Sequence, residues 1–130
     1  MHGPCDRAQR VALGALNESI VVEFRSDVHW PTVHHALCDW HFHCPSPEEV
    51  VRLHVQALDT ERFDVVSIFD GIVRGGATAA PRALVAPLHG NSKTRPVFST
   101  LANATVRYVS DGAGGTSAFT LNARCASPGS

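Results

Sequence analysis

The sequence of 130 residues is poor in charge, and its apolar residues occur only in short runs. Charged residues make up 18% of the chain and the formal net charge is −1, so the excess of one sign that typifies proteins binding nucleic acid or anionic membranes is missing. Although hydrophobic residues make up 44%, no apolar stretch approaches the roughly 18 residues that would span a bilayer. The length fits one domain.

The start of the chain also lacks a secretory signal. Residues 1–5 do not combine a basic start with an apolar block, which is what such a signal requires. A secreted form would therefore be one whose signal has already been removed.

Closely spaced cysteine pairs are absent as well. The chain has four cysteines, Cys5, Cys38, Cys44 and Cys125, spread from one end to the other. A zinc cluster usually needs pairs two to four residues apart, so this spread favours disulfides. Two sequons make Asn17 and Asn103 candidate glycosylation sites. Disulfides and sequons together predict an extracellular or lumenal location in the secretory pathway.

The segment 38–44 is the most informative part of what is present. Every second residue is apolar: Cys38, Trp40, Phe42 and Cys44. On a pleated strand these side chains project from one face, while Asp39, His41 and His43 project from the other, where we expect solvent. This pattern is typical of a core strand of a β-sandwich. A cytosolic strand with four buried apolar residues is the alternative, which the cysteine distribution disfavours.

Strand patterns dominate the rest of the chain. Further strands are predicted at residues 19–24, 52–57, 64–69, 96–100, 104–109 and 118–124. Only residues 47–51 could start a helix, and the residues after them alternate as a strand does. Turn sequences at roughly ten-residue intervals predict an all-β sandwich of two antiparallel sheets. The predicted core comprises Trp40, Phe42, Leu53, Val55, Val66, Ile68, Val106, Tyr108, Phe119 and Leu121.

Four segments, in order, resemble a CUB domain, the extracellular β-sandwich module of complement proteases, astacin-type proteases and spermadhesins. Residues 26–31 resemble the segment ahead of the family's cysteine-x-tryptophan strand, which Cys38-Asp39-Trp40 matches. Residues 58–71 resemble the central signature, and residues 106–112 with 118–121 resemble the closing strand pair. The resemblance implies a disulfide-stapled, CUB-like jelly roll over residues 19–125. Residues 1–18, with Cys5, would lead into it, and residues 126–130 would form a tail or linker.

The resemblance is to a divergent member. Trp30 stands where the family has tyrosine, Ala118 stands where glycine is usual, and the family's third and fourth cysteines are missing.

Two disulfides, Cys5–Cys38 and Cys44–Cys125, are implied by the resemblance to more distant CUB sequences. The count of cysteines alone allows three pairings. A Cys38–Cys44 bridge would have to span about 20 Å of extended strand, whereas bridged α-carbons lie within roughly 7 Å.

The resemblance also implies a calcium site. Its ligands would be Glu61, Asp64 and Asp111 with the backbone at Gly112, because calcium prefers several hard oxygen ligands. The short spacing from Glu61 to Asp64 and the glycines after Asp111 speak against it. In the alternative, Asp64 is a buried acceptor for loop amides, Glu61 is solvated, and no cofactor is bound.

Partner binding would use the same region. By resemblance, Glu61 and Asp111 would receive a lysine of the partner, and Trp30 would anchor it if exposed rather than half-buried.

Histidines offer a further candidate site. His41 and His43 share one strand face, His34 and His35 lie upstream, and His54 lies on the next predicted strand. Two imidazoles can share a zinc ion, but no third carboxylate or cysteine is clearly placed beside them. We expect solvated histidines.

No nucleophile motif surrounds Ser67, Ser99 or Ser110, so the sequence predicts no enzyme. The predicted function is a non-catalytic extracellular or cell-surface module that binds a protein or a glycan, with flanking domains in a larger secreted or membrane-anchored protein. The alternative is a freestanding spermadhesin-like protein that binds carbohydrate or phospholipid.

Overall fold

The computed structural model describes residues 7–25, 37–60, 64–73, 82–91, 94–110 and 117–128. Within these ranges all regular structure is β-strand. The strands are β1 (Gln9–Ala12), β2 (Ile20–Arg25), β3 (Leu37–His43), β4 (Val50–Asp59), β5 (Val65–Asp70), β6 (Val97–Phe98), β7 (Asn103–Val109) and β8 (Ala118–Ala126). The described residues include no helix that could cross a membrane.

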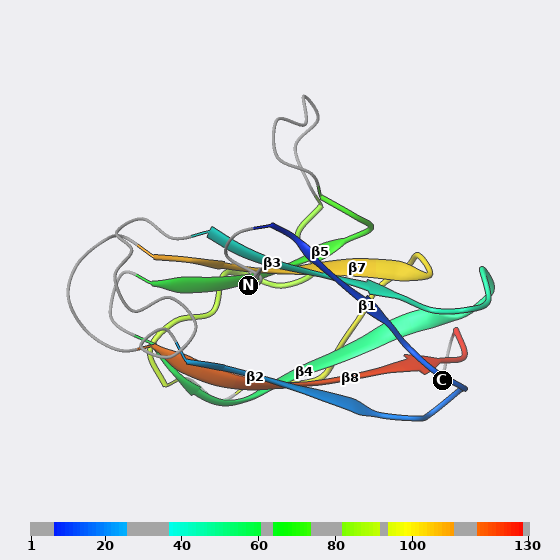
Figure 1. Cartoon of the computed structure of the whole chain (residues 1–130), viewed down its shortest axis with the longest axis horizontal. Helices are drawn as coiled ribbons and strands as arrows, with labels where there is room; N and C mark the ends of the chain where they lie inside the picture. Colours follow the sequence, from blue (N-terminus) through cyan, green and yellow to red (C-terminus); the bar gives the residue numbers. More distant parts are fainter. Residues whose placement is uncertain are drawn as a thin grey trace.

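The strands form two four-stranded sheets that face each other (Figure 1). The first sheet has the order β1-β3-β7-β5, and the second has the order β2-β8-β4-β6. All strand pairs are antiparallel except β1 with β3, which is parallel. The predicted all-β sandwich is therefore confirmed.

Each of the seven predicted strands is present, with shifted ends. Residues 47–51 do not start a helix, because the chain turns at Ser46 to Glu49 and then enters β4. Strand β1 was not predicted, since three of its four residues are exposed and it carries no useful alternation. It lies within the predicted N-terminal segment.

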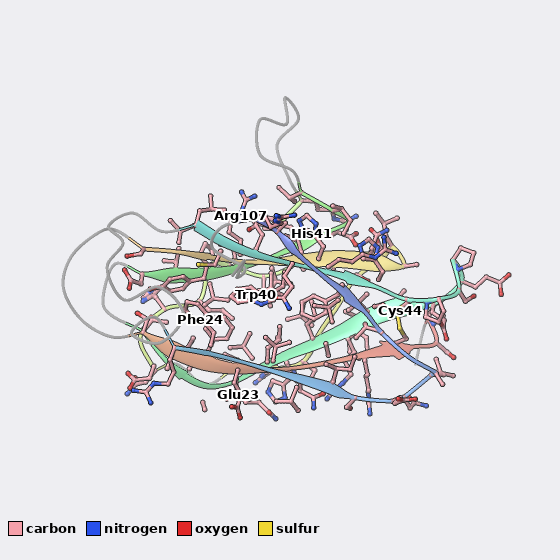
Figure 2. The ribbon with its side chains drawn as sticks, in the orientation of Figure 1. Glu23, Phe24, Trp40, His41, Cys44 and Arg107 are labelled. Atoms are coloured by element: carbon pink, nitrogen blue, oxygen red, sulfur yellow. A yellow bond between two sulfur atoms is a disulfide. The ribbon has the colours of Figure 1, made fainter. Side chains whose placement is uncertain are left out.

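The core lies between the sheets and contains all ten predicted residues. At its centre is an aromatic cluster of Phe24, Trp40, Tyr108 and Phe119, of which Phe24 was not in the predicted core. The Phe24 ring centroid lies 5.4 Å from that of Trp40 and 4.8 Å from that of Tyr108. Figure 2 shows Phe24 and Trp40 side by side between the two layers. These aromatic contacts join the second sheet to the first.

A disulfide between Cys44 and Cys125 joins the sheets at one end, with 5.8 Å between the two α-carbons. It connects the residue after β3 to β8, as the predicted pairing requires. Cys38 is also disulfide-bonded. Its predicted partner, Cys5, lies outside the described residues.

The expectation that the second face of β3 meets solvent is wrong. Asp39 and His41 are only 6% and 8% exposed. The Nε–H and Nη2–H groups of Arg107 donate to the Asp39 carboxylate at 2.7 and 2.9 Å, and His41 Nε2 donates to the carbonyl of Val73 at 3.1 Å. Residues after β5 cross this face, and Thr105 Oγ1 accepts a hydrogen bond from the Val73 amide. Alternation identifies a face but not what covers it.

Candidate partner-binding site at one end of the sandwich

Three gaps in the described residues, 26–36, 61–63 and 111–116, are each flanked by residues at the same end of the sandwich (Figure 1, left). The register shows this, because Leu37 and Val65 both pair with Val109, and Arg25 pairs with Ala118. The residues that flank the gaps are Arg25 and Leu37, Thr60 and Asp64, and Ser110 and Ser117. We call this the Asp64 end.

A buried carboxylate holds this end together. Asp64, immediately before β5, is 2% exposed. Its Oδ2 accepts hydrogen bonds from the Tyr108 hydroxyl and the Ser117 hydroxyl, both at 2.7 Å. Hydrogen bonds to an ionised acceptor are among the stronger ones in proteins. Because Tyr108 belongs to the first sheet and Ser117 precedes a strand of the second, Asp64 fastens the two sheets to each other.

Burial also changes the chemistry of Tyr108. Loss of solvent around the phenol is the main cause that raises the pKa of Tyr108 to about 12. A hydrogen bond with Ser117 opposes this rise, whereas the hydrogen bond and the negative charge of Asp64 add to it. The hydroxyl therefore stays protonated at neutral pH and remains a donor to Asp64.

A second pair of hydrogen bonds fixes the chain just before residues 61–63. The Thr60 amide donates to the Gly90 carbonyl at 2.9 Å, and the Gly90 amide donates to Thr60 Oγ1 at 2.7 Å. Gly90 has a φ of +69°, in the region that glycine tolerates best. Thr60 and Asp64 are thus each anchored, on either side of a three-residue segment.

Of the predicted calcium-binding and partner-binding residues, only Asp64 lies within the described residues. Asp64 is a buried acceptor, in agreement with the alternative to a calcium ligand, and the hydroxyls of Tyr108 and Ser117 are among its donors. Glu61, Asp111, Gly112 and Trp30 lie outside the described residues. The predicted ligand set therefore stays a prediction.

Sequence reasoning missed two residues of this site. Tyr108 was assigned to the core from alternation alone, and nothing in its pattern indicated a bond to Asp64. Ser117 had no signal, since its role depends on the pairing of β8 with the rest of the second sheet.

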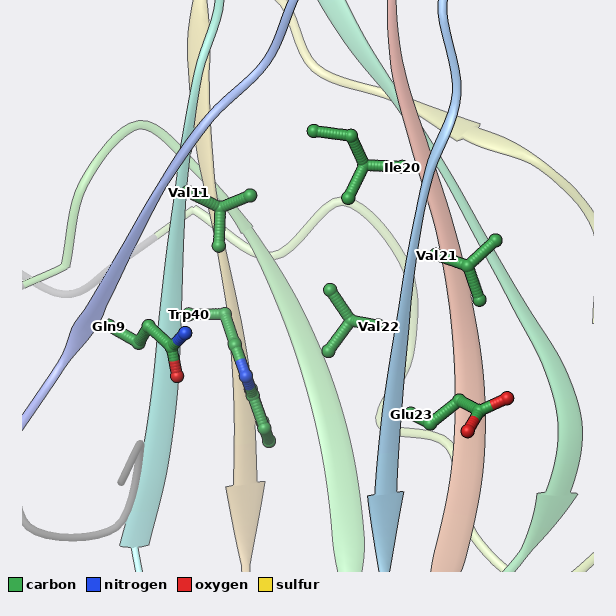
Figure 3. Close-up of a pocket in the computed structure, with 7 residues that line it drawn as sticks. All are labelled: Gln9, Val11, Ile20, Val21, Val22, Glu23 and Trp40. Carbon is green, nitrogen blue, oxygen red and sulfur yellow. The ribbon is translucent and has the colours of Figure 1, made fainter. Parts of the chain in front are cut away.

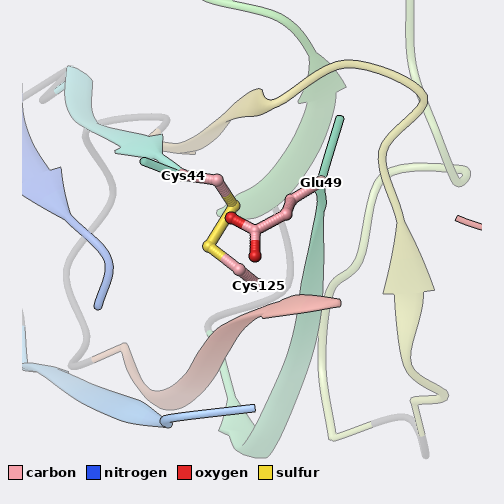
Figure 4. A group of neighbouring side chains, drawn as sticks. All are labelled: Cys44, Glu49 and Cys125. Atoms are coloured by element: carbon pink, nitrogen blue, oxygen red, sulfur yellow. A yellow bond between two sulfur atoms is a disulfide. The ribbon is translucent and has the colours of Figure 1, made fainter. Parts of the chain in front are cut away.

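A second group of potential metal ligands (Figure 4) lies around Cys44, at the opposite end of the sandwich (Figure 2). One ligand atom from each of Cys44, Glu49 and Cys125 lies within 4.8 Å of the others. The two sulfurs are bonded to each other, so neither is the thiolate that metal binding by cysteine needs. Glu49 Oε1 instead accepts a hydrogen bond from the Ser46 amide at 3.3 Å. The role of this group is structural, because its disulfide joins the two sheets.

A recess of about 340 Å³ opens between the edge strands β1 and β2 (Figure 3). Val11, Ile20 and Val22 form apolar walls, and Trp40 lies at its base. Gln9 and Glu23 are its polar lining residues, and the Glu23 side chain points away from Trp40 (Figure 3). The recess suits an apolar group and contains no pairing of a nucleophile with a base.

Within the described residues, no cluster of three potential metal ligands contains a histidine. His41 lies on the first sheet and His54 on the second, and each has Nε2 at a backbone carbonyl, that of Val73 and Thr94 respectively. His34 and His35 lie outside the described residues. Ser99, one of the serines considered as a nucleophile, is buried and accepts a hydrogen bond from the Val51 amide at 2.8 Å.

The two sequons differ in their surroundings. Asn17 is exposed in a turn and has a φ of +66°. Asn103 begins β7 and pairs with His43, and the threonine of its sequon, Thr105, is fully buried. Asn17 is therefore the more accessible of the two candidate acceptors.

Comparisons with known proteins agree with the architecture. The full extracellular region of zebrafish Gpr126/Adgrg6 contains a similar fold, with a TM-score of 0.58 and 16% sequence identity. The match covers 93% of this chain, which spans 15% of the length of the zebrafish chain. A search of curated proteins gave no significant match. The model of the CUB domain family matches residues 17–122, so the chain belongs to the CUB domain family.

Proposed function

We propose that this chain is a non-catalytic binding module of a larger secreted or membrane-anchored protein, and that the Asp64 end recognises its partner. CUB domains are generally extracellular binding modules. The observation that carries the proposal is the hydrogen bonding of Asp64 to Tyr108 and Ser117, which fixes two of the residues that flank the gaps, Asp64 and Ser117. Recognition is best served by residues held on a rigid support.

Calcium is the proposed cofactor of this end. Glu61 directly follows the anchored Thr60, and Asp111 directly follows Ser110. Together with Asp64 and the backbone at Gly112 they offer hard oxygen ligands, the type that calcium prefers. A carboxylate has about four lone-pair sites, so the hydrogen bonds from Tyr108 and Ser117 do not by themselves prevent Asp64 from binding an ion.

The proposed partner is an extracellular protein that presents a lysine or arginine. Glu61 and Asp111 would receive this cation in a charge-assisted pair, and Trp30 would supply apolar contact beside it. Calcium would order the acidic residues before the partner arrives, which lowers the entropic cost of binding.

Thermal unfolding with added calcium tests the cofactor. At 2 mM calcium and a dissociation constant of about 10⁻⁴ M, the protein should gain about 1.8 kcal/mol of stability. Asp111→Ala should abolish the gain, while Glu23→Gln, an exposed change on β2, should keep it. No gain at 5 mM calcium in the parent protein would contradict the calcium site.

Partner binding is tested separately. The immobilised chain should retain cell-surface proteins in calcium and release them when calcium is chelated. Glu61→Ala and Asp111→Ala should lose this retention, and Glu23→Gln should not. Retention that survives both substitutions would place the recognition surface elsewhere.

A further inference from the structure

The outer face of the second sheet carries a row of three cross-strand neighbours. Phe98 of β6 pairs with Arg52 of β4, which pairs on its other side with Arg124 of β8. The next residues along β4 and β8, Leu53 and Ala123, are fully buried in the core. Because side chains alternate along a strand, Phe98, Arg52 and Arg124 project away from the core. We call these three residues the arginine row.

The charges of the arginine row are not balanced. Like charges directly opposite each other on a sheet are destabilising. Within the described part of the chain, no carboxylate pairs with Arg52 or Arg124. Arg124 Nε is also buried and has no hydrogen-bond partner there. A desolvated donor without a partner is costly, so the row has the electrostatics of a site that an anion would complete.

The surroundings of the arginine row indicate what kind of anion fits. Phe98 is 42% exposed and offers an aromatic face. The next outward-facing pair along the same strands is His54 with Asn122, about 7 Å away, and both residues are half-buried. The arginine row thus offers two guanidinium groups and an aromatic ring, with the Asn122 amide close by on the same face of the sheet.

We propose that the arginine row binds the sulfate groups of an anionic glycan. A guanidinium matches a tetrahedral oxyanion with two parallel N–H donors, which an ammonium group cannot do. The Phe98 ring would pack against a sugar ring, and Asn122 would bond to a hydroxyl. The formal net charge of −1 gives no general attraction for polyanions, so recognition depends on these local contacts.

The scaffold beneath the arginine row is rigid. Arg124 directly precedes Cys125, which is bonded to Cys44 and pairs with Val51, the neighbour of Arg52. The row is thus next to the disulfide, whereas Asp64 contacts Ser117 at the start of β8. This site is therefore independent of the proposed calcium-dependent partner site, and chelating calcium should leave glycan binding unchanged.

Binding of the whole chain to a heparin oligosaccharide tests the proposal. Replacing both arginines, Arg52→Gln with Arg124→Gln, should weaken binding about tenfold or more, because two charge-assisted contacts are lost. Phe98→Ala should weaken it less. Arg10→Gln is the matched control, since Arg10 is exposed on β1 of the other sheet and the charge change per site is the same. The doubly substituted protein should melt no lower than the parent, because a like-charge contact has been removed.

Four results would overturn the proposal. The first is that the parent protein does not bind the heparin oligosaccharide, even if it binds inorganic sulfate. The second is an equal loss of affinity in Arg10→Gln, which would indicate general charge attraction. The third is equal binding of desulfated heparin, which would exclude sulfate recognition. The fourth is equal affinity for polyglutamate, which would assign the row to acidic protein segments instead.

Discussion

Tyr108 is the single tyrosine of the chain, so alkaline titration of its phenol reports on one residue at the Asp64 end. The residue is 1% exposed, and its hydroxyl donates to Asp64 at 2.7 Å. Burial is the largest cause that raises the pKa of Tyr108 to about 12. In an unfolded chain the pKa of tyrosine is about 10.

This difference makes stability depend on alkaline pH. The folded pKa is the higher one, so the stabilisation is fully present below about pH 10 and is lost as pH rises towards 12. A difference of about two pKa units corresponds to about 2.7 kcal/mol, of which about 1.4 kcal/mol is lost by pH 11. The loss arises because an ionised phenol would have to stay buried beside the Asp64 carboxylate.

Ultraviolet absorbance of the phenolate measures the pKa directly, and urea unfolding between pH 9 and pH 11 measures the loss of stability. Asp64→Asn should lower the pKa of Tyr108, because it removes a negative charge and a strong acceptor. The urea-unfolded protein is the control and should titrate near pH 10. Titration of the folded protein near pH 10 would refute the reasoning, since it would mean that the hydroxyl meets water.

Three further predictions concern stability and can be checked by urea unfolding. Replacing Cys44 and Cys125 by serine removes a bridge between residues 81 apart and should cost about 4.5 kcal/mol on the chain-entropy estimate, so an unchanged midpoint would contradict that estimate. Asp39→Asn should cost about 3 kcal/mol by leaving Arg107 without its partner, and adding Arg107→Met should restore most of this, whereas additive losses would show that the two are not coupled. His41→Ala should cost about 1–2 kcal/mol because the imidazole is buried and bonded to a carbonyl. A loss of stability under about 0.5 kcal/mol would mean that the side chain is exposed to solvent instead.

The core could be predicted from sequence because alternation encodes it directly. Trp40 and Phe42 on β3, and Leu53 and Val55 on β4, each occupy every second position and are all buried. Strand β1 escaped prediction because an edge strand of four mostly exposed residues has no apolar period to detect. Its place in the sheet depends on pairing with β3, which is a tertiary contact.

The polar network on the first sheet was not predictable for a different reason. Asp39 and Arg107 are 68 residues apart, and their pairing follows from the register of β3 with β7. His41 is buried because the chain after β5 returns across the sheet at Val73. Local patterns contain neither fact. The same limit applied to Asp64, which the sequence singled out as functional but whose partners Tyr108 and Ser117 come from distant strands.

The sandwich is fastened at its two ends by different chemistry, and this bears on where binding takes place. At one end the Cys44–Cys125 bond joins β3 to β8 covalently. At the other end the sheets are joined by the hydrogen bonds of one buried carboxylate, Asp64. A covalent staple does not respond to a cation, whereas the free energy of a buried carboxylate and its neighbours changes when a cation binds. This contrast supports the proposals of a ligand-responsive surface at the Asp64 end and of a fixed anion-binding row beside the disulfide.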